Sequence, residues 1–186
     1  MAILHWPRGV CVGSAVRRVV QTITYFGEMF LAPLLAVVLL FFTSTRGTVD
    51  FAILAAAGIV AWTLAEYAFH RFVLHYLAPT QHRMHHAKPG EPVLTVFWQI
   101  WICFAVVYLI AGGAFLAGSL VAYAWYLFVH HCTHHSAHWL PAFLISNHKG
   151  HHKFATRNYG VTTTLWDNVF GTALAKRPAW TEGDFS

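Results

Sequence analysis

The sequence predicts an all-α integral membrane protein, with about four transmembrane helices beneath a cytosolic, histidine-rich cap for two metal ions. Hydrophobic residues make up 57% and charged residues 10% of the 186-residue chain, whereas about 25% of a typical soluble domain is charged. Several apolar runs are long enough to span a membrane. Of the 14 histidines, all but His5 fall in short clusters that follow these runs. The length predicts one domain, 1–186.

Four apolar runs are the candidate spans, since about 18–20 apolar residues cross the roughly 30 Å hydrocarbon core as a helix. The Ala- and Gly-rich middle of the second run suits close helix contacts. Only Gly112 and Gly113 separate the last two runs, so these are expected to form an antiparallel helical hairpin. The runs lie near 26–43, 49–69, 94–110 and 114–129.

Four spans place both termini and every histidine cluster on the same side of the membrane. Of the 12 Lys and Arg residues, only Arg46 falls on the opposite side. Lys and Arg accumulate in cytoplasmic segments, so the termini and a cap formed by 70–92 and 130–175 are expected to be cytoplasmic. The positive charges lie beside apolar runs, which fits anionic lipid headgroups and gives no reason to expect nucleic acid as a partner.

Three histidine clusters have spacings that place imidazoles on one helical face. The pair His130 and His134 has i, i+4 spacing, and His131 and His135 form a second pair turned by about 100°. Two triplets have the spacing i, i+3, i+4; they are His82, His85 and His86, and His148, His151 and His152.

The first two clustered histidines, His70 and His75, have a different spacing. They are five residues apart, which is about 140° around a regular α-helix. An ideal helix therefore cannot present both to one metal ion. Either they serve different ions, or the helix unwinds between them.

The clustered imidazoles predict a metal site, because neutral imidazole is the commonest metal ligand in proteins. An all-nitrogen ligand set suits Fe, Zn or Cu rather than Mg or Ca. The candidates exceed what one ion uses, so two ions are expected. Structural zinc sites close around four ligands and often recruit cysteine. Cys132 lies among the histidines, but the many imidazoles make it a poor candidate for a metal ligand.

His5 and His138 are not counted among the candidate ligands. They are interpreted as polar side chains at the membrane interface.

The motifs HRFVLH, HRMHH, HHCTHH and HKGHH, with the closing NYGVTTTLWDNVFGT, resemble the fatty acid hydroxylase/sterol desaturase superfamily of integral membrane di-iron oxygenases. The resemblance covers about 62–174. It is nearest to the branch that acts on lipid acyl chains, and the features that carry this likeness are the residues from Glu66 to Arg71 and the closing LWDNVFGT. The resemblance leaves open whether His135 is an additional or substitute ligand. The metal ligands that the resemblance implies are His70, His75, His82, His85, His86, His130, His134, His148, His151 and His152.

The resemblance implies O₂-dependent hydroxylation of an unactivated C–H bond on a membrane lipid acyl chain, at a histidine-ligated di-iron centre. The implied cofactors are two Fe ions, which zinc can replace in purified protein, with O₂ as co-substrate. It implies no catalytic residue beyond the ligands and no other cofactor-binding residue. Only a short segment precedes the first span, so electrons are expected from a separate donor of cytochrome b5 or ferredoxin type with its reductase.

Several alternatives remain open at this level. The same site chemistry allows desaturation, and the substrate is alternatively a sterol or carotenoid. From other classes, a haem electron carrier would place single histidines inside facing helices, and a metal transporter would need polar residues along its spans.

Residues around the motifs have supporting roles in these predictions. Glu66 is expected to orient a ligand histidine from behind or to pair with Arg71. Asp167 and Asn168 are expected to hold the terminal segment in place. Three aromatic residues are interpreted either as interface anchors or as the mouth of a substrate channel; they are Tyr159, Trp166 and Phe170.

Overall fold

The computed structural model describes residues 14–43, 48–77, 79–90, 97–135 and 139–174. Within these ranges every regular element is helical, which confirms the all-α prediction. The long helices are α1 (Ser14–Thr43), α2 (Thr48–Ala68), which continues as the π-helix η2 (Phe69–Leu77), and α4 (Phe97–His135).

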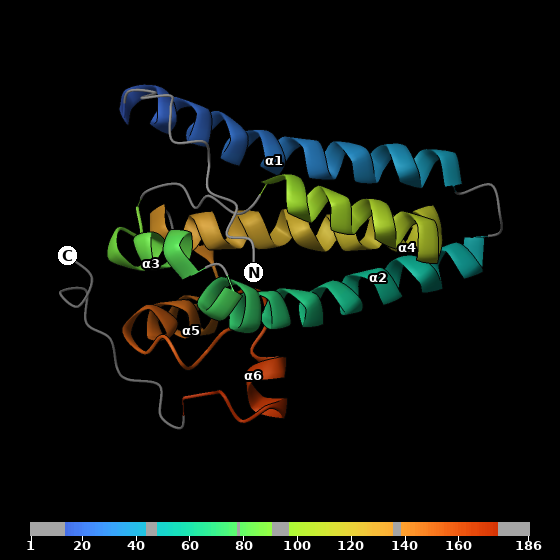
Figure 1. The fold of residues 1–186 in the computed structure, drawn as a ribbon. Coiled ribbons are helices and arrows are strands. Elements are labelled where there is room, and N and C mark those ends of the chain that lie inside the picture. The colour runs from blue at the N-terminus through green and yellow to red at the C-terminus, as the bar shows by residue number, and fades with distance from the viewer. Residues whose placement is uncertain (1–13, 44–47, 78, 91–96, 136–138, 175–186) are drawn as a thin grey trace.

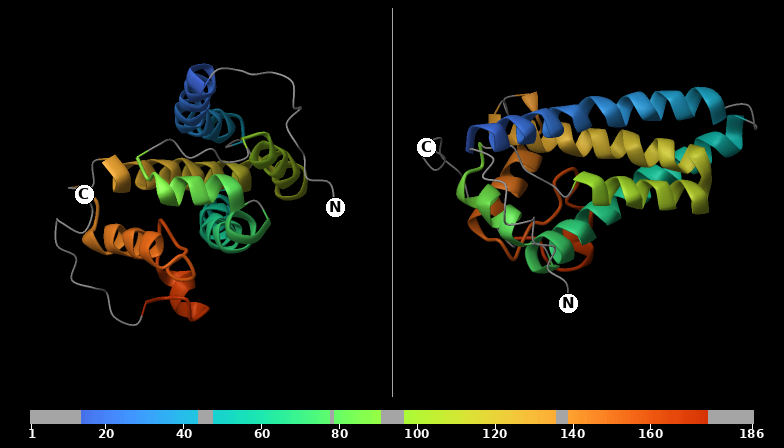
Figure 2. Two further views of the ribbon diagram at one scale, coloured as in Figure 1. Left: turned by 60° about the vertical axis from the view of Figure 1, so that its left-hand side comes forward. Right: turned by 45° about the horizontal axis from the view of Figure 1, so that its top comes forward.

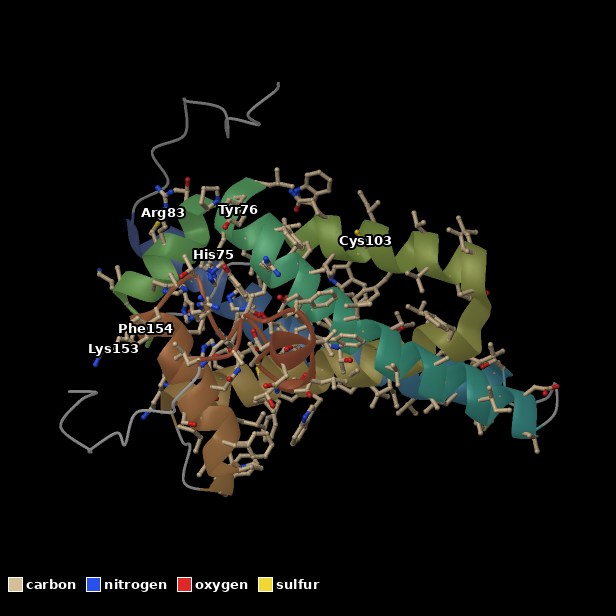
Figure 3. All side chains as sticks on the ribbon, turned by 90° about the horizontal axis from the view of Figure 1, so that it is seen from below. His75, Tyr76, Arg83, Cys103, Lys153 and Phe154 are labelled. Carbon is tan, nitrogen blue, oxygen red and sulfur yellow. The ribbon has the colours of Figure 1, made fainter. Side chains whose placement is uncertain are left out.

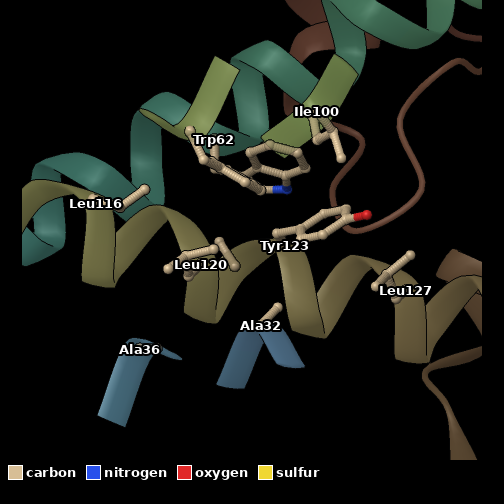
Figure 4. Close-up of a cluster of buried hydrophobic side chains, with 10 residues drawn as sticks. Ala32, Ala36, Trp62, Ile100, Leu116, Leu120, Tyr123 and Leu127 are labelled. Carbon is tan, nitrogen blue, oxygen red and sulfur yellow. The ribbon is translucent and has the colours of Figure 1, made fainter. Parts of the chain in front are cut away.

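The long helices lie side by side, with α4 packed against both α1 and α2 (Figure 1). Their contact is a mostly aliphatic and aromatic cluster that includes Ala32 and Ala36 of α1, Trp62 of α2 and Tyr123 of α4 (Figure 4). Many large apolar side chains on their outer faces are exposed. Exposed apolar surface on this scale fits burial in lipid.

Three described stretches are long and apolar enough to cross a membrane, Thr22–Thr43, Val49–Leu77 and Trp98–His135. They support an integral membrane protein. The predicted third and fourth spans both fall within α4, although the expected start of the third, at 94, lies outside the described residues.

Helix α4 consists of two arms that reverse direction at Gly112. The φ and ψ angles of Gly112 are 81° and 177°, a combination that is essentially restricted to glycine. The arms lie against each other, with the rings of Phe104 and Tyr123 5.3 Å apart, so the predicted hairpin is confirmed. The first arm, 97–111, is about 22 Å long, shorter than the roughly 30 Å hydrocarbon core. The count of four crossings therefore remains a prediction.

Glycines allow α2 and α4 to approach closely. A Cβ atom on Gly118 would overlap the carbonyl oxygen of Ala55, and one on Gly58 would overlap that of Phe115. Ser119 Oγ donates a hydrogen bond to the Gly58 carbonyl at 3.2 Å. The overlapping groups are backbone atoms, so added volume must push the helices apart.

Gly118→Ala is expected to lower the free energy of unfolding by about 2 kcal/mol, since overpacking of this kind costs about 1–3 kcal/mol. Thermal unfolding in detergent measures the effect. The matched control is Gly27→Ala in α1, where nothing lies within 4 Å of an added Cβ; there alanine should be neutral or slightly stabilising. Equal unfolding temperatures for Gly118→Ala and wild type would contradict the close contact.

Three short helices gather at one end of the long ones, where η2 and α4 finish (Figures 1 and 2). They are α3 (Pro79–Ala87), α5 (Ala142–Lys153) and α6 (Leu165–Val169). A second apolar cluster beneath them contains Cys132, Leu144 and Val161. Cys132 is thus a buried core residue at the base of the cap.

Candidate metal centre

The π-helix η2 brings the first two histidines together. Its hydrogen bonds join residues i and i+5, so residues five apart share a face. The ring centroids of His70 and His75 are 5.4 Å apart, and both residues belong to the same histidine group. Of the two interpretations of their spacing, the departure from the α-helix is confirmed, and both rings belong to the same group of nitrogens.

Nine histidines form two groups, in each of which one nitrogen per ring lies within 4.8 Å of the others. Both groups lie at the cap end of the bundle, where Figure 3 labels His75. Group 1 contains His70, His75, His82, His86 and His151. Group 2 contains His85, His130, His134 and His148.

The HxxHH triplets are divided between the two groups. In α3, His82 and His86 join group 1, and His85 joins group 2. In α5, His151 joins group 1, and His148 joins group 2. Each short helix therefore contributes to both groups, and the groups are adjacent.

His152 adjoins both groups. Its Nε2 lies 3.2 Å from His148 Nε2 of group 2, and its ring stacks on His86 of group 1 at 4.4 Å. The structure therefore brings together all ten histidines implied by the motifs, nine within the groups and one between them.

The ring nitrogens of group 1 converge as metal ligands do. His82 Nε2 lies 3.0 Å from Nε2 of His70, His75 and His86. A proton on His82 Nε2 can form only one of these three hydrogen bonds. The remaining nitrogens then have no hydrogen to share with His82 Nε2. A cation among them would satisfy all four nitrogens, so the donor set fits a metal ion.

The spacing between nitrogens also bears on metal binding. Direct Nε2–Nε2 contacts run from 2.9 Å, between His134 and His148, to 3.2 Å, between His152 and His148. Ligands about 2.1 Å from one ion lie about 3.0 Å apart at right angles and about 3.4 Å apart at the tetrahedral angle. Contacts of this length are compatible with imidazole nitrogens that share one ion.

Two group 1 imidazoles are oriented by the backbone of residues 157–163, here called the carbonyl loop. His70 Nδ1 donates to the Tyr159 carbonyl at 2.5 Å, and His151 Nδ1 donates to the Arg157 carbonyl at 2.7 Å. A carbonyl can only accept, so both rings carry their proton on Nδ1. Their Nε2 lone pairs are then free for a metal, the arrangement that orients metal-bound histidines in general.

Glu66 holds the carbonyl loop to α2. Its Oε1 accepts N–H bonds from Val161 at 2.7 Å and Thr162 at 2.9 Å, and its Oε2 accepts the Thr162 hydroxyl. Arg71 donates instead to the Tyr67 hydroxyl. Glu66 therefore supports the ligand candidates His70 and His151 indirectly, through the loop that holds them, and the alternative pairing with Arg71 is not what the structure shows.

Asp167 holds the same loop from the other side, which confirms its predicted structural role. Its two oxygens accept the N–H groups of Tyr159 and Gly160, each at 2.8 Å, and Oδ1 also accepts the Thr172 hydroxyl at 2.7 Å. Asn168 instead donates to a carbonyl at the start of its own helix.

Two asparagines complete this support and were missed by the sequence reasoning. Asn147 Nδ2 donates to the Gly160 carbonyl at 2.6 Å, and Asn158 Nδ2 donates to the Asn147 carbonyl at 3.3 Å. Asn158 has a positive φ of 54°, a conformation that asparagine tolerates better than most residues. The only sequence signal was its place at the head of the closing motif.

Burial keeps the cap histidines in the neutral form that metal binding requires. Desolvation, with neighbouring imidazoles, lowers the pKa of His82 to about 3 and that of His86 to about 4. The same causes lower the pKa of His152 to about 2 and hold the pKa of His148 well below its usual range. These rings are uncharged at neutral pH.

The other histidines lie away from the groups or outside the described residues. His131 packs against Tyr25 and Phe26 of α1, with ring centroids 5.8 and 5.5 Å apart. It also stacks on His135, which is exposed and belongs to neither group. The predictions for His5 and His138 lie outside the described residues.

A largely apolar pocket reaches group 1 from the side of the long helices. His70 and Glu66 lie at one end of it. Its other lining residues, from α2, η2 and both arms of α4, are Trp62, Phe69, Leu74, Ile100, Tyr123 and Tyr126. A small apolar pocket therefore adjoins His70 among the long helices.

Of the aromatic residues suggested for a substrate mouth, Tyr159 packs its ring against group 1, with its centroid 5.3 Å from that of His75 and 5.5 Å from that of His151. Trp166 and Phe170 lie elsewhere. Trp166 Nε1 donates to Thr63 Oγ1 at 3.0 Å, and Phe170 stacks on Tyr67 at 5.3 Å. These contacts pack α6 onto α2. Tyr159 contributes its backbone to the carbonyl loop.

The fold and site define an integral membrane protein with a histidine cluster able to bind metal. Residues 55–172, more than half of the chain, match the family model for fatty acid hydroxylases. The chain therefore belongs to the fatty acid hydroxylase family.

Curated relatives and a solved structure agree with this assignment. A dihydroceramide fatty acyl 2-hydroxylase of Arabidopsis thaliana is 33% identical over 64% of this chain and 60% of its own length. A ceramide very long chain fatty acid hydroxylase of Saccharomyces cerevisiae is 34% identical over 65% of this chain and 38% of its own. The chain thus spans less than two thirds of either relative.

The solved structure is that of full-length scs7p, of which only the hydroxylase domain is visible. It matches with a TM-score of 0.66 and 26% identity, over 83% of this chain and 67% of that chain. The likeness extends beyond the part of the chain that the family model matches.

Proposed function

We propose that this chain is an O₂-dependent hydroxylase of membrane lipid acyl chains, with a di-iron centre held by the ten clustered histidines. The observation that carries the proposal is the pair of adjacent groups of converging imidazole nitrogens. Group 1 would hold one ion and group 2 the other, with His152 completing group 2 through its contact with His148. Iron is proposed because imidazole ligands suit it, among other metals, and because the family that the sequence motifs resemble uses two irons.

When bound, the two iron ions would supply O₂ activation and accept the electrons that the reaction needs. The chain's own contribution is orientation and exclusion of water. The carbonyl loop fixes the proton of His70 and His151 on Nδ1. His148 and His151 are fully buried, which keeps bulk water from the site and limits side reactions.

The apolar pocket beside His70 supports a lipid acyl chain as substrate. It is apolar and lies among the long helices, so its lining suits an acyl tail that enters from the bilayer. Its volume is only about 20 Å³, so the lining side chains must move apart to admit the tail next to group 1. The two relatives described above carry 2-hydroxylase or very long chain hydroxylase in their names. We therefore propose carbon 2 of an acyl chain as the position hydroxylated, with positioning deciding between hydroxylation and desaturation.

Further parts of the proposal concern the whole protein. The chain forms one domain, its spans number four, and the cap faces the cytoplasm, as the distribution of Lys and Arg supports. The electrons come from a separate donor protein.

Lipid analysis of cells expressing wild type or His151→Ala tests the proposal. A 2-hydroxylated acyl lipid is expected in wild type and absent with His151→Ala. His135→Ala, which alters an exposed histidine outside both groups, should produce the same lipid as wild type. An unsaturated product would favour a desaturase, and no difference between wild type and His151→Ala would refute the proposed function.

A further inference from the structure

The described surface of the cap is strongly basic. The only acid in residues 69–77, 79–90 and 139–174 is Asp167, and its carboxylate is fully buried and bonded to the carbonyl loop. The same ranges contain six basic residues, which are Arg71, Arg83, Lys88, Lys149, Lys153 and Arg157. The exposed charge of this part of the cap is therefore of a single sign.

Part of this basic surface borders the least buried edge of the histidine cluster. His75 and His86 of group 1 and His134 of group 2 are half-buried, whereas the other six grouped histidines are buried. In Figure 3, the side chains of Arg83 and Lys153 lie at the same end of the molecule as His75. Arg83 and Lys153 are both exposed.

Exposed aromatic and sulfur-containing side chains accompany these cations. Tyr76 is 65% exposed, Met84 60% and Phe154 42%. Tyr, Phe, Met and Arg are the residue types enriched where proteins bind one another. We call Tyr76, Arg83, Met84, Lys153 and Phe154 the basic rim.

The basic rim is separated from the apolar pocket. The pocket meets His70 from within the bundle of long helices, whereas Arg83 is on α3 and Lys153 ends α5, at the cap end (Figure 1). Group 1 is thus approached from the bilayer on one side and from the cap surface on the other.

We propose that the basic rim is the docking surface of an acidic protein that carries one electron at a time and delivers it to group 1. This inference rests on the proposed function, in which R–H, O₂, two electrons and two protons give R–OH and water. Two molecules of the reduced carrier are each oxidised by one electron per turnover. A positive rim attracts an acidic carrier, raises its rate of association and makes that association sensitive to salt.

The binding test uses the metal-loaded protein in nanodiscs of phosphatidylcholine, a lipid without net charge. The probe is the soluble haem domain of cytochrome b5, an acidic protein, and basic cytochrome c is the probe of opposite charge. We expect cytochrome b5 to bind at low ionic strength and to weaken steeply with salt, because exposed charges are screened. Arg83→Gln and Lys153→Gln should each weaken binding about threefold, and together about tenfold.

The matched control is Val49→Glu, which lowers the net charge by one, as each rim variant does. Val49 is exposed and lies in the first turn of α2, at the end of the bundle away from the cap. It should leave the dissociation constant unchanged. Unchanged binding in the double rim variant, equal binding of the two probes, or no binding by wild type would overturn the proposal.

Two further measurements distinguish failure of the docking proposal from failure of the proposed function. With dithionite as reductant, wild type and the double rim variant should hydroxylate lipid at the same rate, whereas with reduced cytochrome b5 the variant should be about tenfold slower. Absence of product from wild type with dithionite would refute the proposed function, whatever the binding result. If the rim variants bind the probe normally but lose binding to phosphatidylserine vesicles, the surface binds anionic lipid and the docking proposal is wrong.

Discussion

Replacing His151 with alanine is expected to remove at least one of two bound metal ions and to reduce hydroxylation by more than about 100-fold. His151 is fully buried, and its Nε2 lies 3.1 Å from that of His75. The substitution leaves group 1 one ligand short and frees the Arg157 carbonyl that held the ring. Loss of a residue that only hydrogen-bonds to a metal ligand lowers metal affinity about 10–100-fold. Loss of the ligand itself should lower the affinity further.

His85→Ala makes the same test in group 2. The Nε2 of His85 lies 3.1 Å from that of His130, so the ion in group 2 should be lost. Metal analysis of purified protein, together with turnover, measures both variants. The control is His131→Ala, a partly buried histidine that packs on α1 outside both groups, and it should retain two ions. Full metal content in both His85→Ala and His151→Ala would contradict the assignment of the two groups.

Asp167→Ala is expected to destabilise the protein by about 3–5 kcal/mol, because each buried donor left without an acceptor costs about 1–3 kcal/mol. Three donors lose their acceptor at once: the N–H groups of Tyr159 and Gly160, and the Thr172 hydroxyl. Because Tyr159 presents its carbonyl to His70, metal affinity should fall as well, by about 10–100-fold. Thermal unfolding in detergent and competition with a chelator measure the two effects.

The matched variant Asp167→Asn separates charge from shape. Its amide keeps the volume but offers a single accepting oxygen, so it should fall between wild type and alanine in both measurements. Asn168→Ala is the control, because Asn168 is exposed and donates to the Thr164 carbonyl. Wild-type metal affinity in Asp167→Ala would show that the carbonyl loop does not orient His70.

The histidines that the structure brings together could be selected from the sequence, because imidazoles repeated at i, i+3 and i+4 are improbable without a common partner and because their motifs resemble those of a known family. Their division between two groups was not readable. Spacing places His82, His85 and His86 on one face of α3. That face lies between the two groups, so its histidines can join either one. Which site each ring joins depends on α4 and α5, which pack against that face from distant parts of the sequence.

The five-residue spacing of His70 and His75 left two alternatives open, different ions or an unwound helix. The structure shows a π-helix there, which α-helical periodicity alone could not predict. The contacts of Glu66 could not be predicted for a different reason. Its partners Val161 and Thr162 lie more than ninety residues later in the chain, and a carboxylate at the end of a membrane helix suggests nearer partners. Contacts of this kind follow from the whole fold and leave no local pattern.

The sharing of α3 and α5 between the two groups has a consequence for how the centre is assembled. His82, His85 and His86 lie within about one turn of a single helix, as do His148, His151 and His152, and a helix moves as a rigid unit at this scale. Binding of an ion to group 1 immobilises both helices. The rings of group 2 are then already ordered, so a second ion loses less conformational entropy when it binds. Loading should therefore be cooperative, and protein with a single ion should be a minor species.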